Sequence, residues 1–250
     1  TAFLMRECIG EKRSIFGEYV EAAVKDSYDR LIAPSVEREI RTALFDDASE
    51  SAIKLFSENL KNLLMQPPIK NNTVIGISRT ECNLKNSNYF HFLADVTDEK
   101  AITQTLTQIR KQFGYIDVLI NNAGIASMNH FCLTPLTTAK NVMNVNFFGT
   151  FLMTREASKL LRKSKNARIV NFSTVAVPLN LEGEAIYAAS KSAIESLTKT
   201  TAKELAGYGI TVNAVGPVPV KTALIAGVPE DKIQNLLDHQ TIRRFGEPVD

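Results

Sequence analysis

Apolar positions follow two different patterns along the chain, and the change falls near residue 70. In the upstream stretches APSVEREIRTALFDD and SAIKLFSENLKNLLMQPP, apolar residues recur three and four positions apart, which places them on one face of a helix. Pro34 suits a first helical turn, and Pro67 and Pro68 end the second stretch. We therefore predict that residues 1–70 form an all-helical segment.

From residue 71 onward, short apolar runs alternate with amphipathic stretches. We predict strands in TVIGIS, NYFHFLAD, IDVLINNAG, ARIVNFST and ITVNAVGP, and helices over Glu99–Phe113, from about Thr137 and from Ala185. Strands that are separated by helices need right-handed crossovers and form a mainly parallel sheet that is covered on both faces. Residues 71–250 therefore predict an α/β fold with a doubly wound parallel sheet.

Polar residues gather where these predicted strands end. They are Asp95, Asn121, Thr174 and Thr222. Ligands of doubly wound sheets bind outside the carboxyl ends of the strands, so we predict a binding site along this edge.

Composition and charge only exclude some classes of partner and site. The 250 residues carry a formal net charge of +2, which argues against nucleic acid or a membrane surface as a partner. Cys8, Cys82 and Cys132 lie far apart and match no metal-ligand spacing, so we predict no metal site and a reducing compartment. No signal peptide and no apolar run of membrane-spanning length are present, which favours a cytoplasmic protein.

The stretch EAIYAASKSAIESLTK contains two candidate catalytic residues. Tyr187 and Lys191 are four residues apart on a predicted helix, so their side chains share one face. A nearby ammonium favours the phenolate and lowers the phenol pKa, and such a tyrosine can exchange a proton with a substrate oxygen. Taken alone, this spacing is more typical of an ordinary amphipathic helix with a solvated lysine, so the surrounding motifs decide between the two interpretations.

Five motifs follow one another along the downstream part. They are NNAG, NVNFFGT, RIVNFST, YAASK and LAGYGITVNAVGPVPVKT. In this order and spacing they resemble the short-chain dehydrogenase/reductases, in particular the 3-oxoacyl-[acyl carrier protein] reductase group, over about residues 73–250. The resemblance implies a Rossmann-like fold and an oxidoreductase that reduces a ketone, such as a 3-oxoacyl thioester, to an alcohol.

The resemblance also implies a role for each matching residue. Tyr187 would be the general acid, and Lys191 would lower its pKa and hold the nicotinamide ribose. Thr174 stands where the family usually has serine, and its hydroxyl would position the carbonyl oxygen. Asn146 would hold a water in a proton relay behind Lys191.

Other positions match the segments that bind the cofactor in this family. The cofactor would be lined by Asn121, Ala123 and Gly124, and its adenine would meet Asp95 and Val96. The nicotinamide would be flanked by Pro217, Val220 and Thr222, although Val218 replaces the usual glycine of this segment. Arg79 ends the first predicted strand, where relatives that prefer NAD carry an acidic residue. An arginine can pair with a 2′-phosphate, which favours NADP(H), and the alternative interpretation is an exposed charge after a strand.

One motif that the family requires is missing. Its glycine-rich turn, T-G-x-x-x-G-x-G, holds the pyrophosphate and should lie upstream of Thr73, yet residues 1–72 contain only Gly10 and Gly17. The strand before that turn would be central, so both of its neighbours would lose a ladder partner. The last helix and strand of the family are also missing after RRFGEPVD. We therefore predict an incomplete Rossmann-like sheet that is truncated at both ends.

Residues 10 to 75 instead resemble a helical segment of the bacterial transcription accessory protein Tex, most distinctly in IAPSVEREIR and NLLMQPP. This leaves a second hypothesis, a catalytically silent chimera whose helical part is an interaction or nucleic-acid-associated module. For the reductase hypothesis, the resemblance implies a small-molecule ketone or an acyl-carrier-bound substrate. It also implies dimers or tetramers packed through the helices that carry Asn146 and Tyr187.

Overall fold

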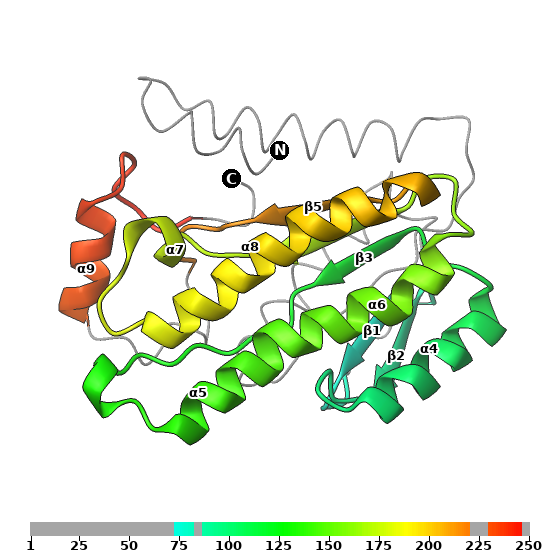
Figure 1. Ribbon diagram of the computed structural model, residues 1–250, viewed down its shortest axis with the longest axis horizontal. Coiled ribbons are helices and arrows are strands. Elements are labelled where there is room, and N and C mark those ends of the chain that lie inside the picture. Colours follow the sequence, from blue (N-terminus) through cyan, green and yellow to red (C-terminus); the bar gives the residue numbers. More distant parts are fainter. Residues whose placement is uncertain (1–72, 83–86, 221–229, 247–250) are drawn as a thin grey trace.

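The computed structural model describes residues 73–82, 87–220 and 230–246. The predicted helical segment over residues 1–70 and the predicted site residue Thr222 lie outside the described residues. Within the described part, parallel strands alternate with helices along the chain, which confirms the α/β class and the parallel sheet (Figure 1).

Two strands form a first, small sheet. β1 (Val74–Ser78) and β2 (Tyr89–Leu93) pair in parallel, with Gly76 opposite His91. A Cβ on Gly76 would clash with the Tyr89 hydroxyl oxygen, so the tyrosine can cross the strand only because position 76 has no side chain. Tyr89 in turn contacts His91, with 2.9 Å between its hydroxyl oxygen and His91 Nδ1.

The helix α4 (Glu99–Phe113) follows β2 and has the bounds that the sequence predicted. Asp98 is its N-cap and accepts a hydrogen bond from Ala101 N at 3.0 Å. Gly114 is its C-cap, where a φ of +83° favours glycine, and its N–H donates to Arg110 O. Both ends of the helix are therefore fixed by local sequence.

Three further strands form a second parallel sheet in the order β3 (Val118–Asn121), β4 (Arg168–Phe172) and β5 (Thr211–Val215). Among the described strands, β1 pairs only with β2, and β3 pairs only with β4. The described sheet is thus divided between β1 and β3, as expected if the central strand of the family is missing.

The helices between these strands form one layer (Figure 1). α5 (Leu136–Met143), the π-helical turn η4 (Asn144–Gly149) and α6 (Thr150–Leu161) follow one another without a break. α8 (Ala185–Leu205) packs beside α5 and η4 and against β4 and β5. Four short elements complete the described part: η3 (Phe131–Leu133), α7 (Ala176–Leu179), η5 (Ala206–Tyr208) and α9 (Glu230–Asp238).

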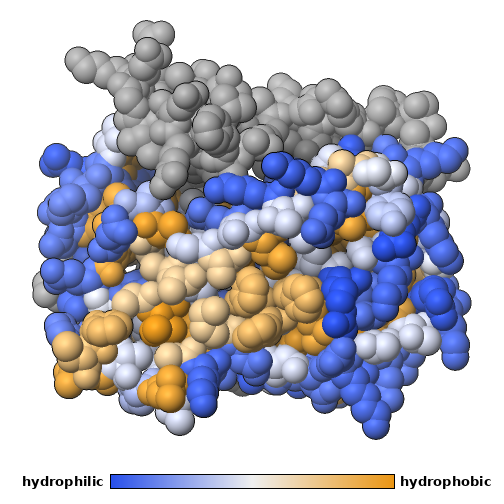
Figure 2. Space-filling model, in the orientation of Figure 1, coloured by the Kyte–Doolittle hydropathy of each residue, from blue (hydrophilic) through white to orange (hydrophobic). Residues whose placement is uncertain are grey.

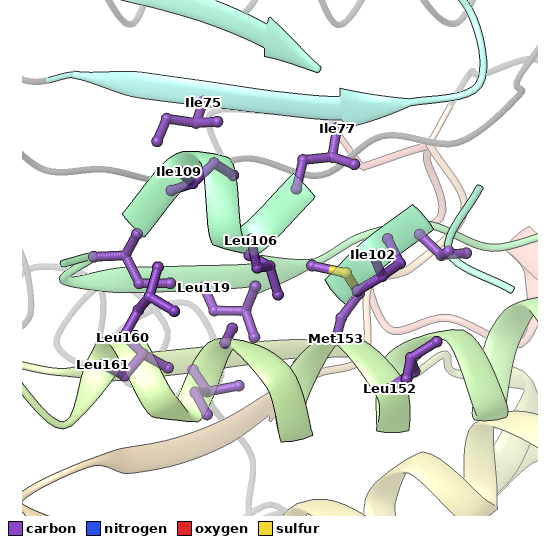
Figure 3. Close-up of a cluster of buried hydrophobic side chains, with 14 of the residues drawn as sticks. Ile75, Ile77, Ile102, Leu106, Ile109, Leu119, Leu152, Met153, Leu160 and Leu161 are labelled. Atoms are coloured by element: carbon purple, nitrogen blue, oxygen red, sulfur yellow. The ribbon is translucent and has the colours of Figure 1, made fainter. Parts of the chain in front are cut away.

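One hydrophobic core joins the two sheets. Ile75 and Ile77 of β1 point toward the buried side chains of α4, and the same cluster contains residues of α6 (Figure 3). The same cluster includes Leu119 of β3 and Ile169 of β4. A shared core therefore holds the β1–β2 part against the β3–β4–β5 part although their strands do not pair.

Within the described residues, no helix is both long and apolar enough to cross a membrane. The same residues contain no group of three or more His, Cys, Asp or Glu side chains that could hold a metal ion.

Candidate active site

The central side chains of the candidate site come from α8. Tyr187 and Lys191 lie one turn apart on its buried face and are 8% and 5% exposed. Lys191 Nζ lies 5.8 Å from the centre of the Tyr187 ring and donates a hydrogen bond to Phe172 O at 2.9 Å. The lysine is therefore buried and hydrogen-bonded, and the interpretation as a solvated charge on an ordinary amphipathic helix does not fit it.

Thr174 reaches the same place from the end of β4. Its side chain lies near enough to the Tyr187 phenol to lower the pKa of that group, and its Oγ1 accepts a hydrogen bond from Ala176 N at 3.2 Å. Gly216 keeps the end of β5 close, because a Cβ there would lie 3.5 Å from the Thr174 backbone. Two hydroxyl groups from different elements thus meet beside one ammonium, an arrangement that can bind and protonate a carbonyl oxygen.

Burial is the largest cause of the pKa shifts of Tyr187 and Lys191. It raises the pKa of Tyr187 to about 12, although the hydrogen bond from Thr174 lowers that pKa and the charge of Glu184 raises it further. Burial also lowers the pKa of Lys191 to about 8. The expectation that Lys191 gives Tyr187 a lowered pKa is therefore wrong for this structure, because desolvation of the phenol outweighs the favourable contacts. Tyr187 keeps its proton at neutral pH and can act as an acid.

Asn146 connects the loop after β3 with α8. It is 0% exposed, and its Nδ2 donates to Ile125 O and to Ser190 Oγ, both at 2.9 Å. Ser190 Oγ donates in turn to Tyr187 O at 2.7 Å. The side chain of Asn146 is thus engaged in holding the site together, and its role in holding a water stays a prediction.

Gly124 lies close against the lysine and Asn146. A Cβ at this position would lie 3.3 Å from Asn146 Oδ1 and 3.4 Å from Lys191 Nζ. Any side chain here would crowd both groups, so the glycine allows the loop after β3 to approach them closely.

Arg79 and Asp95 lie at the carboxyl ends of β1 and β2. Arg79 Nη1 is 3.9 Å from Asp95 Oδ2, and the two side chains are 37% and 35% exposed. Asp95 Oδ1 accepts a hydrogen bond from Thr97 N at 2.8 Å, which fixes the carboxylate. A cation and a carboxylate thus stand together at the edge where the adenosine part of a dinucleotide would bind.

The side chains of three other predicted cofactor residues are buried. Val96 is 1% exposed, Asn121 is 4% exposed and Ala123 is 8% exposed. Asn121 Nδ2 donates to Asn171 Oδ1 at 2.8 Å and to Thr154 Oγ1 at 2.9 Å, so this side chain links β3 with β4 and α6. These residues belong to the framework of the site, and contacts between them and a cofactor stay predictions.

The segment after β5 turns back beside Thr174. Pro217 O accepts a hydrogen bond from Val175 N at 3.4 Å, and Val220 forms a bridge with Gly246. The side chain of Val218 packs against Gly246, where a Cβ would lie 2.6 Å from Val218 Cγ2. Pro217 is therefore next to the site, whereas Val218, which replaces the usual glycine, packs against a different segment.

Two participants were missed in the sequence. Ser173 Oγ donates a hydrogen bond to Glu195 Oε1 at 2.6 Å, directly beside Thr174. The helical spacing contained a signal for the glutamate, because position 195 is one turn beyond Lys191 on the same face of α8. Nothing in the sequence showed that Ser173 points toward this face.

The comparisons with known sequences agree on one family. The profile described as short chain dehydrogenase matches residues 48–233. The chain is 36% identical over 157 residues to the 3-oxoacyl-[acyl-carrier-protein] reductase FabG of Thermotoga maritima, covering 63% of the chain and 64% of that relative. It is 36% identical over 155 residues to the 3-oxoacyl-[acyl-carrier-protein] reductase of a Synechocystis species, covering 62% of each. The chain thus spans less than two thirds of the length of these relatives.

Solved structures give the same fold. The ligand-free aldohexose dehydrogenase of Thermoplasma acidophilum is similar with a TM-score of 0.70 and 25% identity, over 84% of this chain and 83% of that one. An NAD⁺-bound xylitol dehydrogenase is similar with a TM-score of 0.65 and 24% identity, over 82% and 86%. The likeness to the second protein concerns the fold alone, and both support the predicted Rossmann-like fold.

Proposed function

Because the chain belongs to the short-chain dehydrogenase family, we propose that it is a nicotinamide-dependent oxidoreductase that reduces a ketone to an alcohol. The observation that carries this proposal is the buried cluster in which Lys191 and Thr174 both lie beside the Tyr187 phenol. Relatives that are named 3-oxoacyl-[acyl-carrier-protein] reductases, at 30% to 36% identity, support a 3-oxoacyl thioester as the ketone.

Thr174, Tyr187 and Lys191 have different roles in the proposed ketone reduction. Thr174 holds the carbonyl oxygen with its hydroxyl, and Tyr187 donates its phenolic proton to the same oxygen as the alcohol forms. Lys191, charged below a pKa of about 8, stabilises the phenolate that remains. A nicotinamide cofactor would supply the hydride when bound, and Lys191 would hold its ribose.

The finer proposal is that the cofactor is NADP(H). Arg79 supports it, because an exposed guanidinium at the end of β1 suits a 2′-phosphate. The glycine-rich turn is missing from residues 1–72, so the pyrophosphate must be held by other backbone groups if the cofactor binds.

The decisive experiment combines binding with turnover. The purified chain is titrated with NADPH while the fluorescence of the reduced nicotinamide is followed, and consumption of NADPH is then measured with acetoacetyl-coenzyme A. Tyr187→Phe should bind NADPH like the wild type and lose turnover by about 10²-fold to 10⁴-fold. Tyr208→Phe, which changes a tyrosine that is 49% exposed, is the matched control and should keep full activity.

Two results would contradict the proposal. If NADPH does not bind at near-millimolar concentration, the hypothesis of a catalytically silent chimera gains support over that of a reductase. If Tyr187→Phe keeps wild-type turnover, the cluster on α8 is not the catalytic centre.

The proposal includes assembly with copies of the same chain. Phe148 on η4 and Phe151 on α6 are 53% and 40% exposed, and apolar residues gather on this face of the molecule (Figure 2). We expect dimers or tetramers to pack through η4 and α8. Sedimentation should then show a lower mass for Phe148→Glu, whereas Leu93→Glu, at an equally exposed site on β2, should assemble like the wild type. A monomeric wild type would contradict this part.

A cytoplasmic location belongs to the same proposal. Among the described residues, Cys132 is an exposed thiol that forms no disulfide, as is common in a reducing compartment. Detection of the native protein in an oxidising compartment by cell fractionation would contradict it.

A further inference from the structure

Phe172, the last residue of β4, and the two residues after it each meet a side chain of α8. Phe172 O accepts a hydrogen bond from Lys191 Nζ at 2.9 Å, and Ser173 Oγ donates one to Glu195 Oε1 at 2.6 Å. Thr174 lies beside Tyr187 and lowers its pKa. The middle bond, between Ser173 and Glu195, has no role in the proposed function, yet the contacts on both sides of it do.

The middle bond is well placed to control Thr174. Ser173 is 5% exposed, and its N–H also donates to Val215 O at 2.7 Å, so both its backbone and its side chain are held. Only one peptide unit separates it from Thr174, the residue that must meet Tyr187. A small rotation at Ser173 would therefore move the Thr174 hydroxyl away from the phenol.

The bond between Glu195 and Ser173 requires only an acceptor oxygen, which a glutamine amide also offers.

We propose that Glu195 is a positioning residue, which accepts the hydrogen bond of Ser173 and thereby sets the end of β4 so that the hydroxyls of Thr174 and Tyr187 converge on one substrate oxygen. This inference rests on the proposed function of the same site.

The test measures the reverse reaction, alcohol oxidation, across a range of pH. Glu195→Ala and Ser173→Ala should each lower kcat by about tenfold or more with unchanged affinity for NADP⁺. The rise of activity with pH should move to higher pH in both, because the Thr174 hydrogen bond that lowers the Tyr187 pKa is weakened. Glu195→Gln keeps the acceptor and should stay within about threefold of the wild type.

Two controls separate positioning from general stability. The double variant Ser173→Ala/Glu195→Ala should be no slower than either single variant, since both remove the same bond. Thr201→Val removes another hydroxyl bond of α8, from Thr201 Oγ1 to Leu197 O at 2.8 Å, and should leave the pH profile in place. Additive losses, a Glu195→Gln variant as slow as Glu195→Ala, or a Thr201→Val variant with the same pH shift would each overturn the inference.

A second measurement works even if no ketone is turned over. The tyrosines are labelled at Cζ, and the Tyr187 resonance is assigned by its loss in Tyr187→Phe. Glu195→Ala should move this resonance, because the phenol loses its fixed hydroxyl neighbour, and Glu195→Gln should not. An unmoved resonance in Glu195→Ala overturns the inference, whereas absent turnover with a moved resonance counts against the proposed function alone.

Discussion

Asn146 and Ile125 are bonded to each other in both directions: Asn146 Oδ1 accepts from Ile125 N at 2.8 Å, and Asn146 Nδ2 donates to Ile125 O at 2.9 Å. The side chain thus pairs with the backbone of a loop residue much as a neighbouring strand would. It lies in the π-helical turn η4, where the helix departs from its regular bonding. The pair fixes the loop after β3 against the helices that carry the candidate site.

Replacement of Asn146 by alanine should destabilise the fold. It would leave the partly buried N–H and C=O of Ile125 without this partner, at a cost of about 1 to 3 kcal/mol in the free energy of unfolding. Urea denaturation measures this value. Asn144→Ala, at an exposed position of the same turn, is the matched control and should change stability by no more than about 0.5 kcal/mol. Equal losses in the two variants would contradict the structural role of the pair.

The π-helical turn also marks where prediction from sequence stops. The strands from Val74 onward and the helix Glu99–Phe113 were predicted because they carry their signal in local apolar spacing and caps. The sequence likewise indicated one long helix from about Thr137, but it showed neither η4 within that helix nor the contact that Asn146 of this turn makes with Ile125, which is distant in sequence. Local periodicity contains no information about such a partner.

The candidate site, too, could be predicted from the sequence only in part. Tyr187 and Lys191 could be paired from helical spacing alone, and the family motifs added Thr174 and Asn146. The sign of the Tyr187 pKa shift could not be predicted, because it depends on how deeply the phenol is buried. The bond between Ser173 and Glu195 could not be predicted either, because it depends on which way a strand end faces.

We expect a side chain at position 149 to be tolerated only when Val96 is replaced by a smaller residue. A Cβ there would lie 2.8 Å from Val96 Cγ2, inside the packed core. We expect Gly149→Ala to cost about 1 to 3 kcal/mol in the free energy of unfolding. Val96→Ala removes the clashing methyl, so the double variant should be more stable than the sum of the single effects predicts. Strict additivity in urea denaturation would show that the two side chains do not meet.

Arg79 should decide the preference between the two nicotinamide cofactors. Loss of a charge-assisted contact to the 2′-phosphate in Arg79→Ala should raise the KM for NADPH by about tenfold. The KM for NADH should change by less than about twofold, because NADH has no 2′-phosphate for the guanidinium to bind. Arg110→Ala, at an exposed position on α4, is the control for loss of a positive charge. Equal effects on both cofactors would argue against a phosphate contact by Arg79.

Lys191 should make the stability of the fold depend on pH. Burial lowers its pKa from 10.5 to about 8, so between these values the unfolded chain binds a proton that the native chain has released. Stability must therefore rise with pH across this window, by about 3 kcal/mol. Lys191→Met removes the titrating group, and the unfolding free energy of the wild type minus that of this variant should increase from pH 8 to 10.5. The exposed Lys199→Met controls for loss of a charge. A difference that stays flat would mean that the ammonium is not buried as described.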